Sequence, residues 1–168
     1  SVLLTQPPCT LTASTTGTSV SCNGGNNGTA TVSASGNIGA VSYLWSNGST
    51  TASISSLTAG TYNVTVTESP TCSTTTAYTV TQPAALTLNC TKTDVTYNGA
   101  ANGTASVAPS GGTSPYTYLW SNGSTTASIS SLNPGSYSVV VTDNKGCTQN
   151  CSVLLTQPPC TLTASTTG

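Results

Sequence analysis

Residues 43–67 read YLWSNGSTTASISSLTAGTYNVTVT, and their pattern gives the clearest indication of the fold. At its end, polar and apolar residues alternate, so that Tyr62, Val64 and Val66 share one face, as in a half-buried β-strand. Near its start, Asn47-Gly48 is a turn dipeptide of the kind that connects antiparallel strands. The stretch therefore predicts short strands joined by tight turns.

The first part of this stretch recurs unchanged at residues 118–132, an offset of 75 residues. The same offset relates Tyr62 to Tyr137 and Cys72 to Cys147, so the chain contains two homologous modules. The phrase Thr-Gln-Pro marks their junctions, near Gln6, Gln82 and Gln157, because proline after an extended run stops a strand and stiffens a linker. We place module 1 at residues 9–83 and module 2 at residues 84–158.

A longer period encloses both modules. Residues 1–17 recur letter for letter as residues 152–168, which gives a period of 151 residues. We therefore expect the chain to be a window cut from a longer tandem array. Residues 1–8 would then be the last strand and linker of a preceding module, and residues 159–168 the first strand of the next one.

Short extended runs bounded by Gly, Asn and Pro fill each module, and no segment has a helical pattern. In module 1 we expect one or two opening strands within residues 10–22 and further strands at 28–32, 41–45, 52–57, 61–67 and 76–81. Six or seven short strands in about 75 residues predict an all-β fold. The chain would form two tandem β-sandwich modules of the immunoglobulin-like or fibronectin-III-like type.

Aromatic and leucine residues at repeated positions predict the core. A tryptophan precedes the Asn-Gly turn of each module, where a buried indole can pack between two sheets. The phrase L-x-x-G-x-Y has the form of a tyrosine corner, in which the phenol bonds back to the backbone. The predicted core residues are Trp45, Trp120, Tyr62, Tyr137, Leu57 and Leu132.

Only 3% of the residues are charged, and there is no histidine. This composition excludes nucleic-acid binding by phosphate neutralisation. It also excludes general acid-base catalysis, which needs a titratable group poised near neutral pH. We expect no enzyme activity, no cofactor and no metal site, and also no membrane insertion in this segment, because no apolar run has membrane-spanning length.

The seven cysteines are Cys9, Cys22, Cys72, Cys90, Cys147, Cys151 and Cys160. Because Cys160 repeats Cys9, each period has six, and this even number is typical of disulfides outside the cytoplasm. One scheme, based on the end of the sandwich at which each cysteine lies, joins Cys9 to Cys72 and Cys90 to Cys151, and staples Cys22 of module 1 to Cys147 of module 2. A simpler scheme joins Cys22 to Cys72 and Cys90 to Cys147. The sequence leaves both open, and we slightly prefer the first, in which Cys160 bonds the equivalent of Cys72 in the next unit.

Residues 103–147, GTASVAPSGGTSPYTYLWSNGSTTASISSLNPGSYSVVVTDNKGC, resemble the SprB repeat of Bacteroidota cell-surface proteins, and residues 22–72 resemble it more loosely. The shared elements are the Asn-Gly turn before a short strand, the motif GG-T-x-PYTY-x-W-S-N-G, the L-x-x-G-x-Y corner and the closing T-D-x-x-G-C. Module 1 departs from them in two loops, at 37–41 and 68–71. The resemblance implies a very large secreted adhesin at the cell surface, built of tandem modules, associated with gliding motility and attachment, and without catalytic residues.

Two functional hypotheses follow. The first is a structural or adhesive segment of an extracellular filament, stabilised by disulfides, whose partners are neighbouring copies of the same repeat. The alternative is an array of carbohydrate-binding modules, with surface glycans as partners. In that case tyrosines such as Tyr43, Tyr116 and Tyr118 should be exposed rather than buried.

Overall fold

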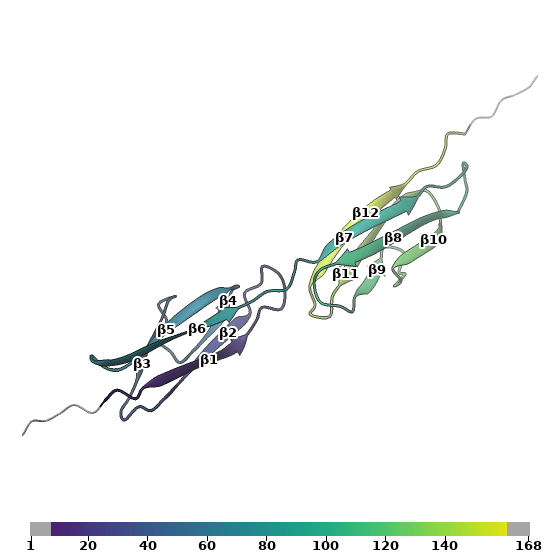
Figure 1. Ribbon diagram of the computed structural model, residues 1–168. Coiled ribbons are helices and arrows are strands. Elements are labelled where there is room, and N and C mark those ends of the chain that lie inside the picture. The colour runs from purple at the N-terminus through teal and green to yellow at the C-terminus, as the bar shows by residue number, and fades with distance from the viewer. Residues whose placement is uncertain (1–7, 161–168) are drawn as a thin grey trace, which may run out of the picture. The chain divides into compact units, whose positions relative to one another are not determined.

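A computed structural model describes residues 8–160 of the chain. The chain divides into two compact units between Pro83 and Ala84, and each unit is a β-sandwich (Figure 1). The strands predicted for residues 1–8 and 159–168 lie almost entirely outside the described residues.

Module 1 consists of two three-stranded antiparallel sheets. Its strands are β1 (Thr12–Thr18), β2 (Gly28–Ser35), β3 (Ser42–Trp45), β4 (Ser53–Leu57), β5 (Gly60–Ser69) and β6 (Cys72–Val80). One sheet has the order β1-β2-β4 and the other the order β3-β5-β6. The chain crosses from one sheet to the other after β2, β3 and β4, whereas β1-β2 and β5-β6 are neighbours within a sheet, as in an immunoglobulin-like sandwich.

Module 2 repeats this topology. Its strands are β7 (Thr87–Thr93), β8 (Gly103–Ser110), β9 (Thr117–Trp120), β10 (Ser128–Leu132), β11 (Gly135–Thr142) and β12 (Thr148–Leu155). The sheets have the orders β7-β8-β10 and β9-β11-β12. The chain is therefore all-β within its described residues, with two immunoglobulin-like modules in tandem.

The two modules bury equivalent side chains between their sheets. Offset by 75 residues, the buried pairs are Ala30/Ala105, Val32/Val107, Trp45/Trp120, Ile54/Ile129, Leu57/Leu132, Val64/Val139, Val66/Val141 and Val80/Leu155. Glycine at the start of β2 is part of this packing, because a Cβ at Gly28 would lie 2.6 Å from Val80 Cγ1 and 2.9 Å from the Leu57 carbonyl oxygen. Each core is thus closed at this end by a residue without a side chain.

One expectation about the strands needs correction. Each module has six strands within its described residues, and the opening segment of module 1 forms one strand, β1; both numbers lie within the predicted ranges. The last strand begins at Cys72 rather than at residue 76, because Cys72 already pairs with Ser69 across a tight turn. The alternation of apolar and polar residues did not mark the start of β6, because threonine and serine fill the first half of this strand.

Candidate functional site at the ends of the modules

Each module has two ends, which we name by the path of the chain. The entry end is where the first strand begins and the last strand starts, near Cys9 and Cys72 in module 1. The exit end holds the loop between the first two strands and the segment that follows the last strand. The sequence junctions lie at these ends, so they are where a tandem array would be joined.

At the exit end of module 1, the loop between β1 and β2 holds the departing chain. The Asn23 Nδ2 group donates to the carbonyl oxygen of Pro83 over 3.0 Å, and the Gly24 N–H donates to Gln82 Oε1 over 2.8 Å. The Val20 N–H also donates to the Thr81 carbonyl oxygen over 3.1 Å. The Thr-Gln-Pro phrase is therefore fixed to its own module up to its last residue.

Module 2 makes the same contacts at its exit end. The Asn98 Nδ2 group donates to the Pro158 carbonyl oxygen over 3.3 Å, and the Gly99 N–H donates to Gln157 Oε1 over 3.1 Å. An ion pair is added here: Lys92 Nζ lies 2.7 Å from Asp94 Oδ1, which also accepts the Thr156 N–H over 2.7 Å. The hydrogen bond from Lys92 and that from Thr156 hold the pKa of Asp94 below its ordinary value.

The entry end of module 2 binds the chain at the first residue of the module, Ala84. The Gly112 N–H donates to the Ala84 carbonyl oxygen over 2.9 Å, and Leu86 is buried. Asp143 organises the surrounding loops, since its carboxylate accepts the N–H groups of Thr113, Lys145 and Cys147 over 2.8–2.9 Å. Burial would raise the pKa of Asp143, yet these donors together hold that pKa below its ordinary value.

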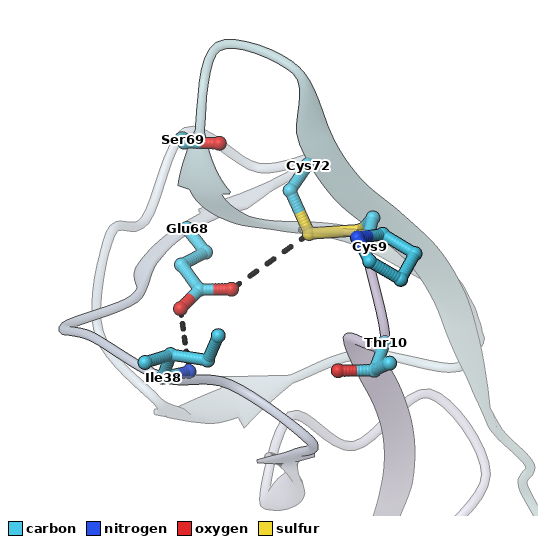
Figure 2. Close-up of a pocket in the computed structure, with 7 residues that line it drawn as sticks. Cys9, Thr10, Ile38, Glu68, Ser69 and Cys72 are labelled. Atoms are coloured by element: carbon cyan, nitrogen blue, oxygen red, sulfur yellow. Dashed lines mark hydrogen bonds between the residues drawn. A yellow bond between two sulfur atoms is a disulfide. The ribbon is translucent and has the colours of Figure 1, made fainter. Parts of the chain in front are cut away.

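The entry end of module 1 uses Glu68 at the position of Asp143. Glu68 Oε1 accepts the N–H groups of Ile38 and Gly39 over 2.6 and 2.7 Å, and Figure 2 shows the carboxylate between Ile38 and the Cys9–Cys72 disulfide. Glu68 Oε2 lies 3.7 Å from Cys72 Sγ, a contact without a proton because that sulfur is bonded to Cys9. These residues border a shallow cavity of about 170 Å³.

Two disulfides are present within the modules. Cys9 bonds to Cys72 at the entry end of module 1, and Cys90 bonds to Cys151 between β7 and β12 of module 2. These bonds match the first pairing scheme and contradict the simpler one, which needed Cys72 for Cys22. The simpler scheme was wrong because the chain enters module 1 directly beside the start of β6.

The remaining cysteines lie at the module ends. Cys22 is in the loop between β1 and β2 at the exit end of module 1, and Cys147 precedes β12 at the entry end of module 2. Both are disulfide-bonded, whereas Cys160 is exposed and is the free cysteine of the described residues. The preferred scheme's staple between Cys22 and Cys147 stays a prediction.

The predicted core residues lie in or against the two cores. Trp45, Trp120, Leu57 and Leu132 are buried, while Tyr62 and Tyr137 are half-buried. Each tryptophan Nε1–H donates to a threonine carbonyl oxygen six residues later, over 2.9 Å to Thr51 and 2.8 Å to Thr126. Both tyrosine corners are present, since each phenol donates over 3.2 Å to the carbonyl oxygen four residues earlier.

The tyrosines proposed as a sugar-binding face are also packing residues. Tyr43, Tyr116 and Tyr118 are half-buried against the cores, and the Tyr116 hydroxyl donates to the Gly111 carbonyl oxygen over 2.6 Å. Tyr97, at the exit end of module 2, is instead 65% exposed. The aromatic exposed on the surface is therefore one that the sequence analysis did not single out.

Sequence reasoning also missed the side chains that fix the linkers. Asn23 and Gln82 recur at the same offset as Asn98 and Gln157, and this repetition was an available signal. The described residues contain no group of three or more His, Cys, Asp or Glu side chains placed to hold a metal ion. Within those residues, no helix is long and apolar enough to cross a membrane.

Solved structures similar to this chain contain immunoglobulin domains. One on Dscam isoform specificity has 14% identity over 86% of this chain and 47% of that chain, with a TM-score of 0.39. A DIP-gamma IG1+IG2 structure has 12% identity over 86% and 97%, with a TM-score of 0.42. A 282-residue C-terminal fragment of intimin, bound to the intimin-binding domain of Tir, has 18% identity over 86% and 62%, with a TM-score of 0.44. The chain thus spans about half the length of the Dscam chain.

At the level of sequence, no curated protein matches the chain. The SprB repeat family matches residues 14–50 and 89–125, which run from the first strand of each module to just beyond its Asn-Gly turn. The tyrosine corners and the closing T-D-x-x-G-C lie outside these matched residues. The chain thus carries two copies of the SprB repeat, one in each β-sandwich module.

Proposed function

We propose that this chain is a non-catalytic structural or adhesive segment of an extracellular cell-surface filament, in which modules follow one another without an unbound linker. The observation that carries this proposal is that two consecutive residues form hydrogen bonds with different modules. Module 1 binds the carbonyl oxygen of Pro83, and module 2 binds the carbonyl oxygen of Ala84. A linker whose residues are all held by a module is restrained, whereas an unbound flexible linker behaves as a random coil.

A disulfide between Cys22 and Cys147 is the second part of the proposal. In module 1, Cys72 bonds to Cys9, but the equivalent of Cys9 in module 2 is Ala84, which has no sulfur. The Cys9–Cys72 bond therefore has no counterpart at the equivalent positions of module 2. Cys22 lies in the loop that anchors Pro83, and Cys147 follows Asp143, whose loop packs beside the anchor of Ala84. Each cysteine thus lies, within its own module, near the residue that begins or ends the junction, Pro83 for Cys22 and Ala84 for Cys147.

Disulfides and low charge favour an extracellular setting for such a filament. Disulfides persist in oxidising compartments, and the match of both modules to the SprB repeat family supports a cell-surface setting. The three carboxylates of the chain have structural roles. Glu68 and Asp143 bind loop N–H groups, and Asp94 pairs with Lys92.

Electron microscopy of native cell-surface material tests the filament proposal. With modules about 25–35 Å long, two in line predict a thread with an axial repeat of roughly 50–70 Å for every 151 residues. Antibodies against this chain should decorate the thread at that spacing. A compact particle without axial periodicity would refute the proposal.

A further inference from the structure

The two kinds of module differ at one exposed position of the exit end. Where module 1 has Cys22, module 2 has Tyr97, which is 65% exposed. Tyr97 precedes Asn98, the residue that holds the carbonyl oxygen of Pro158. A large, exposed aromatic residue therefore directly precedes the asparagine that holds the chain where it leaves module 2.

The entry ends differ in a complementary way. Where module 2 has Thr113, module 1 has Ile38, whose side chain is 82% exposed. Ile38 borders the cavity of about 170 Å³ that the Cys9–Cys72 disulfide, Pro8 and Thr10 also line (Figure 2). An isoleucine so exposed beside a disulfide and a proline forms an apolar surface at the entry end, of a kind that often binds a partner.

The duplicated residues bring these two surfaces together. Because residues 152–168 repeat residues 1–17, the Pro158-Pro159-Cys160 of one unit would be the Pro7-Pro8-Cys9 of the next. The upstream module holds the carbonyl oxygen of Pro158, and the downstream module holds Cys9 through Cys72. Two residue steps separate these anchors, at most about 7 Å of extended chain. The cavity is thus within reach of Tyr97.

We propose that Tyr97 of one repeat unit docks against Ile38 in the cavity beside the Cys9–Cys72 disulfide of the next unit. The partner is a second copy of this chain's repeat, and the inference rests on the proposed function, in which units follow one another. The oxygen Oε2 of Glu68 contacts the sulfur of Cys72 and offers the tyrosine hydroxyl an acceptor. Two kinds of junction would then alternate along the filament. Within a unit, the Cys22–Cys147 disulfide joins module 1 to module 2; between units, the contact of Tyr97 with Ile38 joins module 2 to the next module 1.

Nitration by tetranitromethane tests the contact. The protein is a two-unit chain, residues 1–151 followed by residues 1–168, made in two forms that carry Tyr97→Phe in either the upstream or the downstream unit. We expect the upstream Tyr97 to react roughly ten-fold more slowly than the downstream one, as a contact worth about 1.4 kcal/mol predicts. The downstream Tyr97 should react as fast as that of the 168-residue chain. Equal rates at the two positions would overturn the inference.

A second variant identifies the docking surface. Ile38→Ser in the downstream unit should restore full reactivity to the upstream Tyr97, whereas Leu44→Ser, which changes a residue 57% exposed elsewhere on module 1, should not. Because the Ile38 side chain is exposed and serine adds no charge beside Glu68, the thermal unfolding of the 168-residue chain should be unchanged by Ile38→Ser. Persistent protection in that variant would contradict the assigned surface. A periodic thread in micrographs together with a fully reactive upstream Tyr97 would refute this joint and leave the filament in place.

Discussion

Asn23 donates a hydrogen bond from its side-chain amide to the carbonyl oxygen of Pro83 over 3.0 Å, so the last residue of module 1 is held by that module's first loop. Asn98 and Pro158 repeat the relationship 75 residues later. Since module 2 holds the very next residue, Ala84, through Gly112, the junction contains no residue that neither module binds.

Replacing Asn23 with alanine should loosen the junction. We expect Gln82 to gain motion on the picosecond-to-nanosecond timescale, because one of the bonds that fix the Thr-Gln-Pro phrase is lost. The heteronuclear NOE of the Gln82 backbone amide measures this motion. Asn26→Ala, at an exposed position of the same loop, is the matched control and should leave the NOE unchanged. An unchanged NOE in Asn23→Ala would show that the bond does not restrain the linker.

Gly28→Ala should destabilise module 1 by about 1–3 kcal/mol, the usual cost of adding atoms to a packed core. The added Cβ would overlap Val80 Cγ1 and approach the Leu57 carbonyl oxygen. Gly39→Ala is the control, because its Cβ would meet only Glu68 Oε1, at 3.7 Å. Urea unfolding of the two variants measures the difference. Equal stabilities would mean that the start of β2 has room for a side chain.

The Cys90–Cys151 disulfide should stabilise module 2 by about 4 kcal/mol, as expected for a closed loop of its length. The double variant Cys90→Ser with Cys151→Ser removes it without leaving a free thiol. Module 1 is an internal control: its equivalent positions are Thr15 and Thr76, and the Thr15 hydroxyl donates to the Ala77 carbonyl oxygen over 2.7 Å instead. In calorimetry, the transition of module 2 should fall while that of module 1 stays in place. A loss below about 1 kcal/mol would contradict the chain-entropy account.

Asp143 should make the stability of module 2 depend on acid pH. Its pKa is lower in the folded state than the ordinary value of 3.8, so its stabilising effect is complete above that value. The effect should disappear as the pH falls through the lowered pKa, because protonation removes the negative charge that strengthens the hydrogen bonds from three loop N–H groups. Unfolding measured from pH 6 to pH 2 checks this sign. Asp143→Asn should be less stable than the natural chain at pH 6, and the gap should close towards pH 2; a gap independent of pH would rule out the carboxylate's role.

Much of the fold could be predicted because the decisive signals are local and appear twice. The tryptophan before the Asn-Gly turn and the L-x-x-G-x-Y corner each predicted a hydrogen-bonded arrangement that both modules contain. The alternation of Tyr62, Val64 and Val66 likewise predicted β5.

Features that depend on pairing between distant segments were not predictable in the same way. Ser56 and Ser131 have left-handed backbone conformations, with φ near 57° and 56°, although serine rarely marks such positions. The register shifts between Gly28 and Ala30 where β2 meets β4, so these conformations accompany an irregularity in strand pairing. The roles of Glu68 and Asp143 likewise depend on loops some 30 residues away in the sequence.

The most direct test of the proposed Cys22–Cys147 bond between the modules is disulfide mapping of the natural protein. Digestion under non-reducing conditions with thiols blocked, followed by mass spectrometry, should recover a peptide containing Cys22 linked to one containing Cys147. That bond should disappear on reduction together with the Cys9–Cys72 and Cys90–Cys151 links. Recovery of Cys22 or Cys147 as a blocked free thiol, or of either one joined to a different cysteine, would contradict the account.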